Sequence, residues 1–170
     1  MKKGLPLLNV ILFKTVIFSI FVPGTVVGLV PYLLLTRGEA VFPVSFGLIR
    51  YSGIIPMITG IVLYIAGATG FVEKGKGTPA PIDPPRLLVT SGPYRFTRNP
   101  MYLGGTLILL GEAVLFESAI LLAYLLFIFL AFDLFVILYE EPHLRKVFGS
   151  AYEEYCRNVP RWLPFRRARS

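Results

Sequence analysis

Long apolar runs separated by short polar segments dominate the hydropathy pattern of this chain. A helix needs about 20 apolar residues to cross the hydrocarbon core of a bilayer. Four runs, at residues 10–35, 52–71, 100–116 and 119–139, predict spanning helices. The third run is short, so its helix is expected to stop near Glu112 and to tilt or only just cross. The pattern predicts an all-α fold, a polytopic membrane helical bundle of about four spans.

Prolines and glycines modify the first two predicted spans. Pro23-Gly24 and Pro31 interrupt the first run and predict a kinked or broken helix, which membranes tolerate where neighbours satisfy the freed backbone groups. The second run carries Gly53, Gly60 and Gly67 at a spacing of seven residues. Seven residues are close to two helical turns, so these glycines form one bare stripe that favours close packing of two helices.

The segment 72–99 differs from the spans on either side. It holds five of the 14 prolines and fits neither a helix nor a regular strand. Its apolar Leu87-Leu88-Val89 and the pair Tyr94/Phe96 argue against disorder, so we expect an ordered cytoplasmic segment along the membrane surface. Asn99-Pro100 then predicts the start of the third helix, with Asn at the N-cap and Pro at the first helical position.

The end of the chain is predicted to be an amphipathic tail over residues 142–164. Pro142 is expected to end or kink the fourth span, after a tight turn at Glu117-Ser118 between the third and fourth. Apolar residues then recur at three- and four-residue spacing: Leu144, Val147, Phe148, Ala151 and Tyr155. Residues 159–164 are expected to fold the chain back over a candidate site at this end of the spans, with Trp162 near the membrane interface. Residues 1–170 are interpreted as a single domain.

Composition and charge support a membrane protein. Of 170 residues, 55% are hydrophobic and 16% charged, and the mean hydropathy is +0.68. Fourteen of the 17 Lys and Arg residues lie before the first span, in 72–99 or after Pro142, whereas only Arg37 and Arg50 lie in the loop after the first span. The positive-inside tendency therefore predicts that both termini and the 72–99 segment are cytoplasmic. The net charge of +7 is attributed to the orientation of the spans and to attraction to anionic lipids, not to nucleic-acid binding.

Two residue types limit the possible chemistry. Cys156 is the only cysteine, so no intrachain disulfide is available, and it is interpreted as a structural bystander. His143 is the only histidine, which excludes a His-based metal cluster. No dinucleotide fingerprint, P-loop or zinc spacing occurs.

Two polar clusters are predicted to meet on one side of the membrane. Arg98-Asn99-Pro100-Met101-Tyr102 opens the third helix, and Glu140-Glu141 ends the fourth. A helix N-terminus attracts anions and carboxylates attract cations, so a zwitterionic cofactor with an ammonium, a carboxylate and a sulfonium matches this layout. Asp133 shares a helix face with Glu140, about 10 Å away. A role of Asp133 at this site and simple pairing of its carboxylate with another helix have nearly equal weight.

At this point the sequence resembles the isoprenylcysteine carboxyl methyltransferases and the related phospholipid methyltransferases. The resemblance covers about Leu88 to Pro164 and is carried by two blocks: Leu88-Val89-Thr90-Ser91-Gly92-Pro93-Tyr94…Arg98-Asn99-Pro100-Met101-Tyr102-Leu103-Gly104 and Glu140-Glu141…Phe148-Gly149…Tyr152…Tyr155…Val159-Pro160. It implies an integral membrane enzyme that uses S-adenosylmethionine without a Rossmann domain. The cofactor pocket is implied between the last spans and the C-terminal segment.

The resemblance also implies roles for particular residues. The implied cofactor-binding residues are Tyr94, Asn99, Tyr102, Glu140 and Glu141. Arg98 and Glu141 are the expected catalytic residues, and the expected substrate-binding residues are Arg98, Asp133, Arg157 and Arg161. The eukaryotic prenylcysteine enzymes have His where this chain has Asn99, and a basic residue where it has Asn158. These differences leave the identity of the acceptor open.

Methyl transfer to a lipid-linked or small apolar acceptor is the leading hypothesis. A carboxylate acceptor needs only charge pairing, whereas an amine must first lose a proton, and the chain offers no convincing neutral-pH base. O-methylation of a carboxylate is therefore preferred slightly to N-methylation of a phospholipid amine or S-methylation of a thiol. A non-enzymatic four-span transporter or assembly subunit is the alternative from a different class. The oligomeric state is left open.

Overall fold

Helices make up nearly all of the chain that the computed structural model describes, which comprises residues 5–37, 46–78 and 86–162. No β-strand occurs in these ranges. Three continuous helices are long and apolar enough to cross a membrane: Leu8–Arg37, Gly47–Gly75 and Ala119–Phe148. A fourth, shorter apolar helix is α4 (Pro100–Leu115). The all-α membrane bundle predicted from the hydropathy pattern is confirmed, and α4 ends at Leu115 and not near Glu112.

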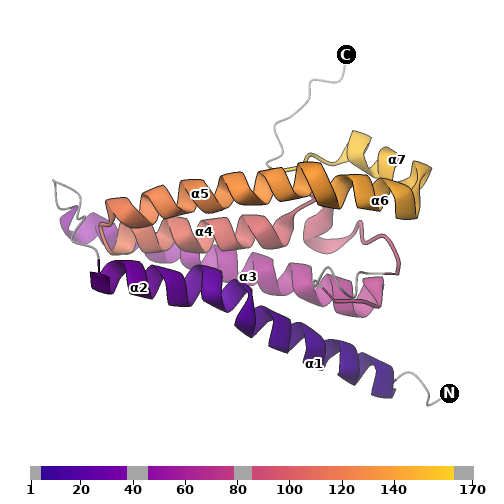
Figure 1. Cartoon of the computed structure of the whole chain (residues 1–170), viewed down its shortest axis with the longest axis horizontal. Coiled ribbons are helices and arrows are strands. Elements are labelled where there is room, and N and C mark those ends of the chain that lie inside the picture. The colour runs from indigo at the N-terminus through magenta and orange to yellow at the C-terminus, as the bar shows by residue number, and fades with distance from the viewer. Residues whose placement is uncertain (1–4, 38–45, 79–85, 163–170) are drawn as a thin grey trace.

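The first span is bent, as its prolines predicted. It consists of α1 (Leu5–Phe21), the π-helix η1 (Thr25–Leu29) and α2 (Val30–Arg37). Figure 1 shows the axis changing direction between α1 and α2. A proline lacks the N–H of a regular α-helix and clashes with the preceding turn, so a wider helical turn beside Pro23 is a physical consequence of the sequence. The sequence also predicts a loop at residues 36–39; Thr36 and Arg37 belong instead to the end of α2, and Gly38 and Glu39 lie outside the described residues.

The glycine stripe of the second span packs directly on α4. This span begins with the 3₁₀-helix η2 (Gly47–Gly53) and continues as α3 (Ile54–Gly70). A Cβ on Gly60 would overlap the carbonyl oxygen of Gly104, and a Cβ on Gly53 would overlap that of Gly111. Only bare backbone permits this approach, so the packing role predicted for the stripe is confirmed.

The segment after α3 contains more helix than its sequence predicted. The π-helix η3 (Phe71–Gly75) continues α3 into this segment, and a 3₁₀-helix, η4 (Gly92–Arg95), precedes α4. The expectation of no helix is therefore wrong at both ends. Val89 and Tyr94 are buried, whereas Leu87 and Phe96 are exposed. The segment is ordered where it is described, and residues 79–85, which hold four of its prolines, lie outside the described residues.

The last long helix passes through Pro142 without ending. It comprises α5 (Ala119–Phe135), the π-helix η5 (Val136–Glu140) and α6 (Glu141–Phe148). Pro142 falls in the first turn of α6, where its missing N–H is tolerated. Of the two predicted outcomes at Pro142, an end or a kink of the helix, the end is therefore wrong. The helix ends instead at Gly149, whose φ of +54° suits a residue without a side chain.

The C-terminal helices bury the predicted apolar face only in part. A second short helix, α7 (Ser150–Asn158), follows Gly149 and lies beside α6 at the same end of the bundle (Figure 1). Tyr152 and Tyr155 are buried, while Val147 and Ala151, which were expected on the apolar face, are exposed. Leu144 and Phe148, which were also expected on the apolar face, are partly buried and pack against the two tyrosines. The buried tyrosines pack with Val89, Tyr94 and Val159 in one apolar cluster.

Candidate active site

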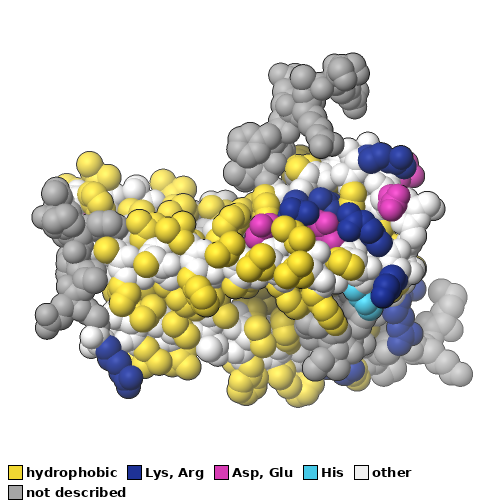
Figure 2. All heavy atoms as spheres, turned by 45° about the horizontal axis from the view of Figure 1, so that its top comes forward, with side chains coloured by type: hydrophobic (Ala, Val, Ile, Leu, Met, Phe, Trp, Pro, Cys, Tyr) yellow, Lys and Arg dark blue, Asp and Glu magenta, His cyan; other side chains and the backbone are white. Residues whose placement is uncertain are grey.

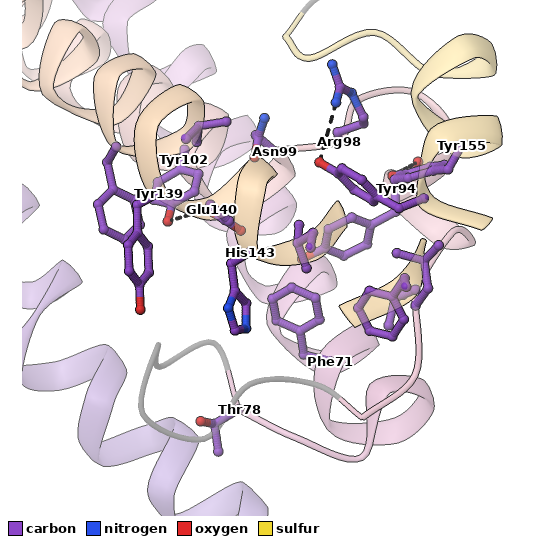
Figure 3. A pocket seen from close by; sticks show the side chains of 17 residues that line it. Phe71, Thr78, Tyr94, Arg98, Asn99, Tyr102, Tyr139, Glu140, His143 and Tyr155 are labelled. Carbon is purple, nitrogen blue, oxygen red and sulfur yellow. Dashed lines mark hydrogen bonds between the residues drawn. The ribbon is translucent and has the colours of Figure 1, made fainter. Parts of the chain in front are cut away.

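A hollow lies between the C-terminal helices and the start of α4. We call it the C-terminal hollow, and Figure 3 shows the side chains that line it. It encloses about 850 Å³ of space that is partly open to solvent. Its lining residues come from η3, η4, the start of α4, η5, α6 and α7: Phe71, Thr78, Leu88, Val89, Tyr94, Arg98, Asn99, Tyr102, Phe135, Val136, Tyr139, Glu140, His143, Leu144, Phe148, Tyr152 and Tyr155.

A second hollow lies deeper among the helices, and we call it the interhelical hollow. It encloses about 710 Å³ and is bounded by the bend of the first span together with α3, α4 and α5. Its lining is mainly apolar and includes Phe18, Val27, Met101 and Phe132. The two hollows share six lining residues: Phe71, Tyr94, Arg98, Asn99, Tyr102 and Glu140. We call these six residues the shared wall.

Tyr102 and Glu140 form the centre of the shared wall. The Tyr102 hydroxyl donates a hydrogen bond of 2.9 Å to Oε2 of Glu140 (Figure 3). Tyr102 stands in the first turn of α4, and its ring packs against Phe132 with centroids 4.8 Å apart. Glu140 ends η5. The contact therefore joins the start of one span to the end of another, as the sequence predicted for these two clusters.

Tyr94 is held from two sides. Its backbone carbonyl accepts a 2.6 Å hydrogen bond from the Tyr155 hydroxyl, and its ring lies 5.2 Å from that of Phe71. Burial, followed by the nearby charge of Glu140, raises the pKa of the Tyr94 phenol well above its usual value. Tyr94 therefore stays a neutral phenol near pH 7 and offers the hollow an aromatic face, not a base.

Glu141 is occupied by three arginines. Its side chain is only 5% exposed, and its carboxylate lies 3.0 Å from Nη1 of Arg98, 2.7 Å from Nε of Arg161 and 3.4 Å from Nη2 of Arg145. Glu141 is not among the described residues that line either hollow. Its carboxylate fixes the position of Arg98, which does line both. A direct contact between Glu141 and cofactor stays a prediction.

Arg98 has two further neighbours from α7. Its Nη1 lies 2.7 Å from Sγ of Cys156 and 3.4 Å from the Tyr152 hydroxyl. Its Nε is buried and has no hydrogen-bond partner among the described residues. Cys156, interpreted as a bystander, thus contacts a residue of the shared wall.

Residues 160–162 cross over the start of α4, and we call them the strap. The carbonyl oxygen of Arg161 accepts hydrogen bonds from Oγ1 of Thr97 (2.9 Å) and Nδ2 of Asn99 (3.1 Å). Nε1 of Trp162 donates to Oδ1 of Asp133 at 2.9 Å. Asn99 therefore occupies the N-cap position of α4, as predicted, but its side chain binds the strap and makes no cap hydrogen bond. Asp133 likewise binds the strap and not another span.

The structure brings most of the predicted site residues together. Tyr94, Arg98, Asn99, Tyr102 and Glu140 lie in the shared wall. Glu141, Asp133 and Arg161 lie behind it in the contacts that hold the strap and Arg98. Arg157 is exposed on α7 and does not line either hollow within the described chain.

Several residues that line the C-terminal hollow had no predicted site role, among them Tyr139, His143, Tyr152 and Tyr155. His143 was weighed only as a metal ligand, and no group of three metal-binding side chains occurs in the described residues. Its ring lies almost parallel to that of Tyr139 at 6.2 Å. The spacing of Leu144, Phe148 and Tyr152 at intervals of four is the signal by which the tyrosines of α7 were detectable.

Comparisons with known proteins identify the family of the chain. The profile of the family described as phospholipid methyltransferase matches residues 49–151, more than half of the chain. A protein-S-isoprenylcysteine O-methyltransferase of Schizosaccharomyces pombe is 38% identical over 84 residues, which cover 46% of this chain and 33% of that protein. Protein-S-isoprenylcysteine O-methyltransferase B of Arabidopsis thaliana is also 38% identical over 84 residues, covering 46% of this chain and 40% of the relative.

The match thus spans well under half the length of these curated relatives. No solved structure matches the chain. The profile match covers α3, α4 and α5 and includes all six residues of the shared wall. The chain belongs to the phospholipid methyltransferase family.

Proposed function

We propose that this chain is a membrane methyltransferase that moves a methyl group from S-adenosylmethionine to the carboxylate of a lipid-linked or small apolar acceptor. The observation that carries the proposal is the shared wall between the two hollows. A reaction between a water-soluble donor and an apolar acceptor needs two compartments of different character that meet at one point. The family match and the O-methyltransferase names of the curated relatives support the same reaction.

The residues of the C-terminal hollow fit S-adenosylmethionine. Glu140 offers a carboxylate to the ammonium group, and the N–H groups at the start of α4 offer donors to the carboxylate. The rings of Phe71, Tyr94 and Tyr102 offer aromatic faces to the sulfonium and the base. When bound, the cofactor supplies an electrophilic methyl group.

Arg98 is the acceptor-orienting residue in this proposal. It faces both hollows, and its guanidinium is held by Glu141 from behind. A guanidinium of fixed orientation positions a carboxylate through its planar donors. A carboxylate is already a nucleophile at neutral pH, so the site needs alignment and exclusion of water more than it needs a base. The apolar body of the acceptor occupies the interhelical hollow.

The proposed site faces the cytoplasm. Figure 2 shows Lys and Arg side chains gathered at the end of the molecule that carries α6 and α7, next to the apolar surface of the bundle. The positive-inside tendency places such an end in the cytoplasm. Single cysteines at Lys76 and Arg37, both exposed, on a Cys156→Ser background test this orientation. In intact cells an impermeant thiol reagent should label Arg37→Cys and not Lys76→Cys, and the reverse pattern would overturn the orientation.

Calorimetric titration with S-adenosylhomocysteine tests the cofactor site. Glu140→Gln should weaken binding about 10- to 100-fold, because a hydrogen bond to a charged group contributes about 1.5–3 kcal/mol. Glu154→Gln, on the exposed surface of α7, is the matched control and should bind like the wild type. Equal affinities of all three proteins would remove Glu140 from the site. Absence of binding to the wild type would favour a non-enzymatic membrane protein.

Methyl labelling tests the acceptor. Membrane extract incubated with the purified protein and methyl-labelled S-adenosylmethionine should yield a labelled product that mass spectrometry identifies. A carboxyl methyl ester releases labelled methanol in mild base. A base-stable product would instead indicate an amine or a thiol acceptor and would reject O-methylation while leaving the enzyme class in place.

A further inference from the structure

Two neighbouring glycines of α4 have different surroundings. A Cβ on Gly104 would lie 2.7 Å from the carbonyl oxygen of Gly60, so the packing of α3 on α4 requires glycine there. A Cβ on Gly105 would lie 3.8 Å from Cγ1 of Val27 and 3.9 Å from Cε2 of Phe132. These are ordinary van der Waals distances. Helix packing therefore explains the absence of a side chain at Gly104 and does not explain it at Gly105.

Gly105 faces the interhelical hollow. It is buried, and it lines this hollow together with Val27 and Phe132. It follows Tyr102 by three residues, so the two share one side of α4, with Gly105 about 4.5 Å deeper along the axis. The Phe132 ring packs on Tyr102 itself. The space left by the missing side chain thus lies about one helical turn from the shared wall.

We propose that Gly105 is a specificity-determining residue that admits acceptors with a branched apolar body close to the reacting carboxylate. This inference rests on the proposed function and adds the class of acceptor to it. A larger side chain at position 105 has Val27 and Phe132 on two sides, so its remaining atoms extend into the hollow. They would occupy the space that a branched group needs, and a thin straight chain would be affected less.

Photoaffinity labelling measures the preference of the interhelical hollow for branched over straight chains without knowledge of the natural acceptor. Two diazirine-bearing carboxylic acids of equal carbon number serve as probes, one with a straight alkyl chain and one with a branched isoprenoid chain. Adducts are mapped by peptide mass spectrometry to the walls of the interhelical hollow. Misfit of a single methylene in an apolar pocket costs about 10- to 200-fold. Gly105→Leu should therefore lose about tenfold or more of its labelling by the branched probe and about threefold or less by the straight one.

Two further variants make the result decisive. Val27→Ala in the Gly105→Leu background removes one neighbour and should restore labelling by the branched probe. Gly105→Ala, which fits at the distances given above, should shift the ratio of the two probes in the same direction by a smaller factor. If Gly105→Leu lost both probes equally, or neither, the proposal would be wrong. Absence of adducts in this hollow of the wild type would also overturn it.

Titration with S-adenosylhomocysteine separates this inference from the proposed function. Cofactor affinity and thermal midpoint should be unchanged in Gly105→Ala and nearly unchanged in Gly105→Leu. Loss of cofactor affinity in Gly105→Leu would mean that its fold is damaged, and the probe ratio of Gly105→Ala then decides. A wild type that takes up the probes selectively but binds no S-adenosylhomocysteine would reject the methyltransferase proposal and keep Gly105 as a determinant of apolar ligand shape.

Discussion

Two contacts hold α4 by opposite means. One is its packing against α3, and the other is the crossing of the strap over its start. Along α3, bare backbone of Gly53 and Gly60 meets bare backbone of Gly111 and Gly104. At the start of α4, the chain is held by directional polar bonds, including those from Thr97 and Asn99 to Arg161. The first contact depends on shape, and the second depends on charge and hydrogen bonding.

The difference separates assembly from positioning. Close helix packing in lipid gains van der Waals energy along its whole length and tolerates no added volume. The strap meets the chain at the start of α4, where the shared wall begins, and Glu141, which its Arg161 also binds, holds the guanidinium of Arg98. We therefore expect changes in the glycine contact to remove folded protein, and changes around the strap to alter binding and turnover first.

The largest effect is expected from Gly60→Leu. A side chain there overlaps the backbone of α4, so the two helices must separate along their contact, which costs more than overpacking a single core site. Little folded protein should survive extraction in detergent, as measured by size-exclusion chromatography and thermal denaturation. Gly28→Leu is the matched control, because a Cβ on Gly28 has no neighbour within 4 Å. Equal yields of the two variants would contradict the packing argument.

Glu141→Gln should have the next largest effect. Removal of the charge leaves the mostly buried Arg98 without its counterion, and breaking a buried ion pair costs about 3–5 kcal/mol. The lower end of this range applies, because Arg145 and Arg161 are partly exposed. The thermal midpoint should fall by several degrees, and turnover should fall further than stability because Arg98 loses its orientation. A variant with wild-type turnover would show that Arg98 is positioned by other contacts.

The glycine contact was predictable from the sequence, and the charge cluster was only partly so. Gly53, Gly60 and Gly67 repeat within one helix, so their common face follows from helical geometry alone. Glu141 meets Arg161 only after α7 and the strap have folded back, and no local period encodes that return. For a related reason, the sequence left open whether Pro142 ends or kinks the helix. This proline falls in the first turn of α6, and a π-helix precedes it, which propensity alone does not reveal.

The site residues divide in the same way. Tyr102 and Glu140 were predicted together because Tyr102 begins one span and Glu140 ends the next on the same side of the membrane. On α7, Tyr155 is buried as predicted, whereas Tyr152 and not Ala151 is the second buried residue. The pairing of Asp133 with Trp162 joins two residues that share no sequence pattern. Residues placed by helix ends were predictable, and residues placed by the returning chain were not.

Arg98→Lys should give an intermediate effect that distinguishes acceptor from cofactor. Lysine keeps the charge near Glu141 but lacks the planar donors that hold a carboxylate in two contacts. Turnover should fall about 10- to 100-fold, in line with the 1.5–3 kcal/mol of a hydrogen bond to a charged group, while S-adenosylhomocysteine affinity stays within about threefold of wild type. Arg95→Lys, on the exposed surface next to the site, is the control. Parallel losses of turnover and affinity would assign Arg98 to the cofactor.

The smallest effect, and the sharpest test of the strap, is expected from Trp162→Phe. Phenylalanine keeps an aromatic ring near Phe129, whose centroid lies 5.2 Å from that of Trp162, and removes only the N–H that donates to Asp133. The Asp133 carboxylate is about 29% exposed, so water replaces part of the lost bond, and a loss of about 1 kcal/mol is expected. The affinity for S-adenosylhomocysteine should fall about fivefold or less. Asp133→Asn and the double variant complete a mutant cycle. If the strap acts through this bond, the two losses should be less than additive, whereas strict additivity would mean that Trp162 holds the strap through ring packing alone.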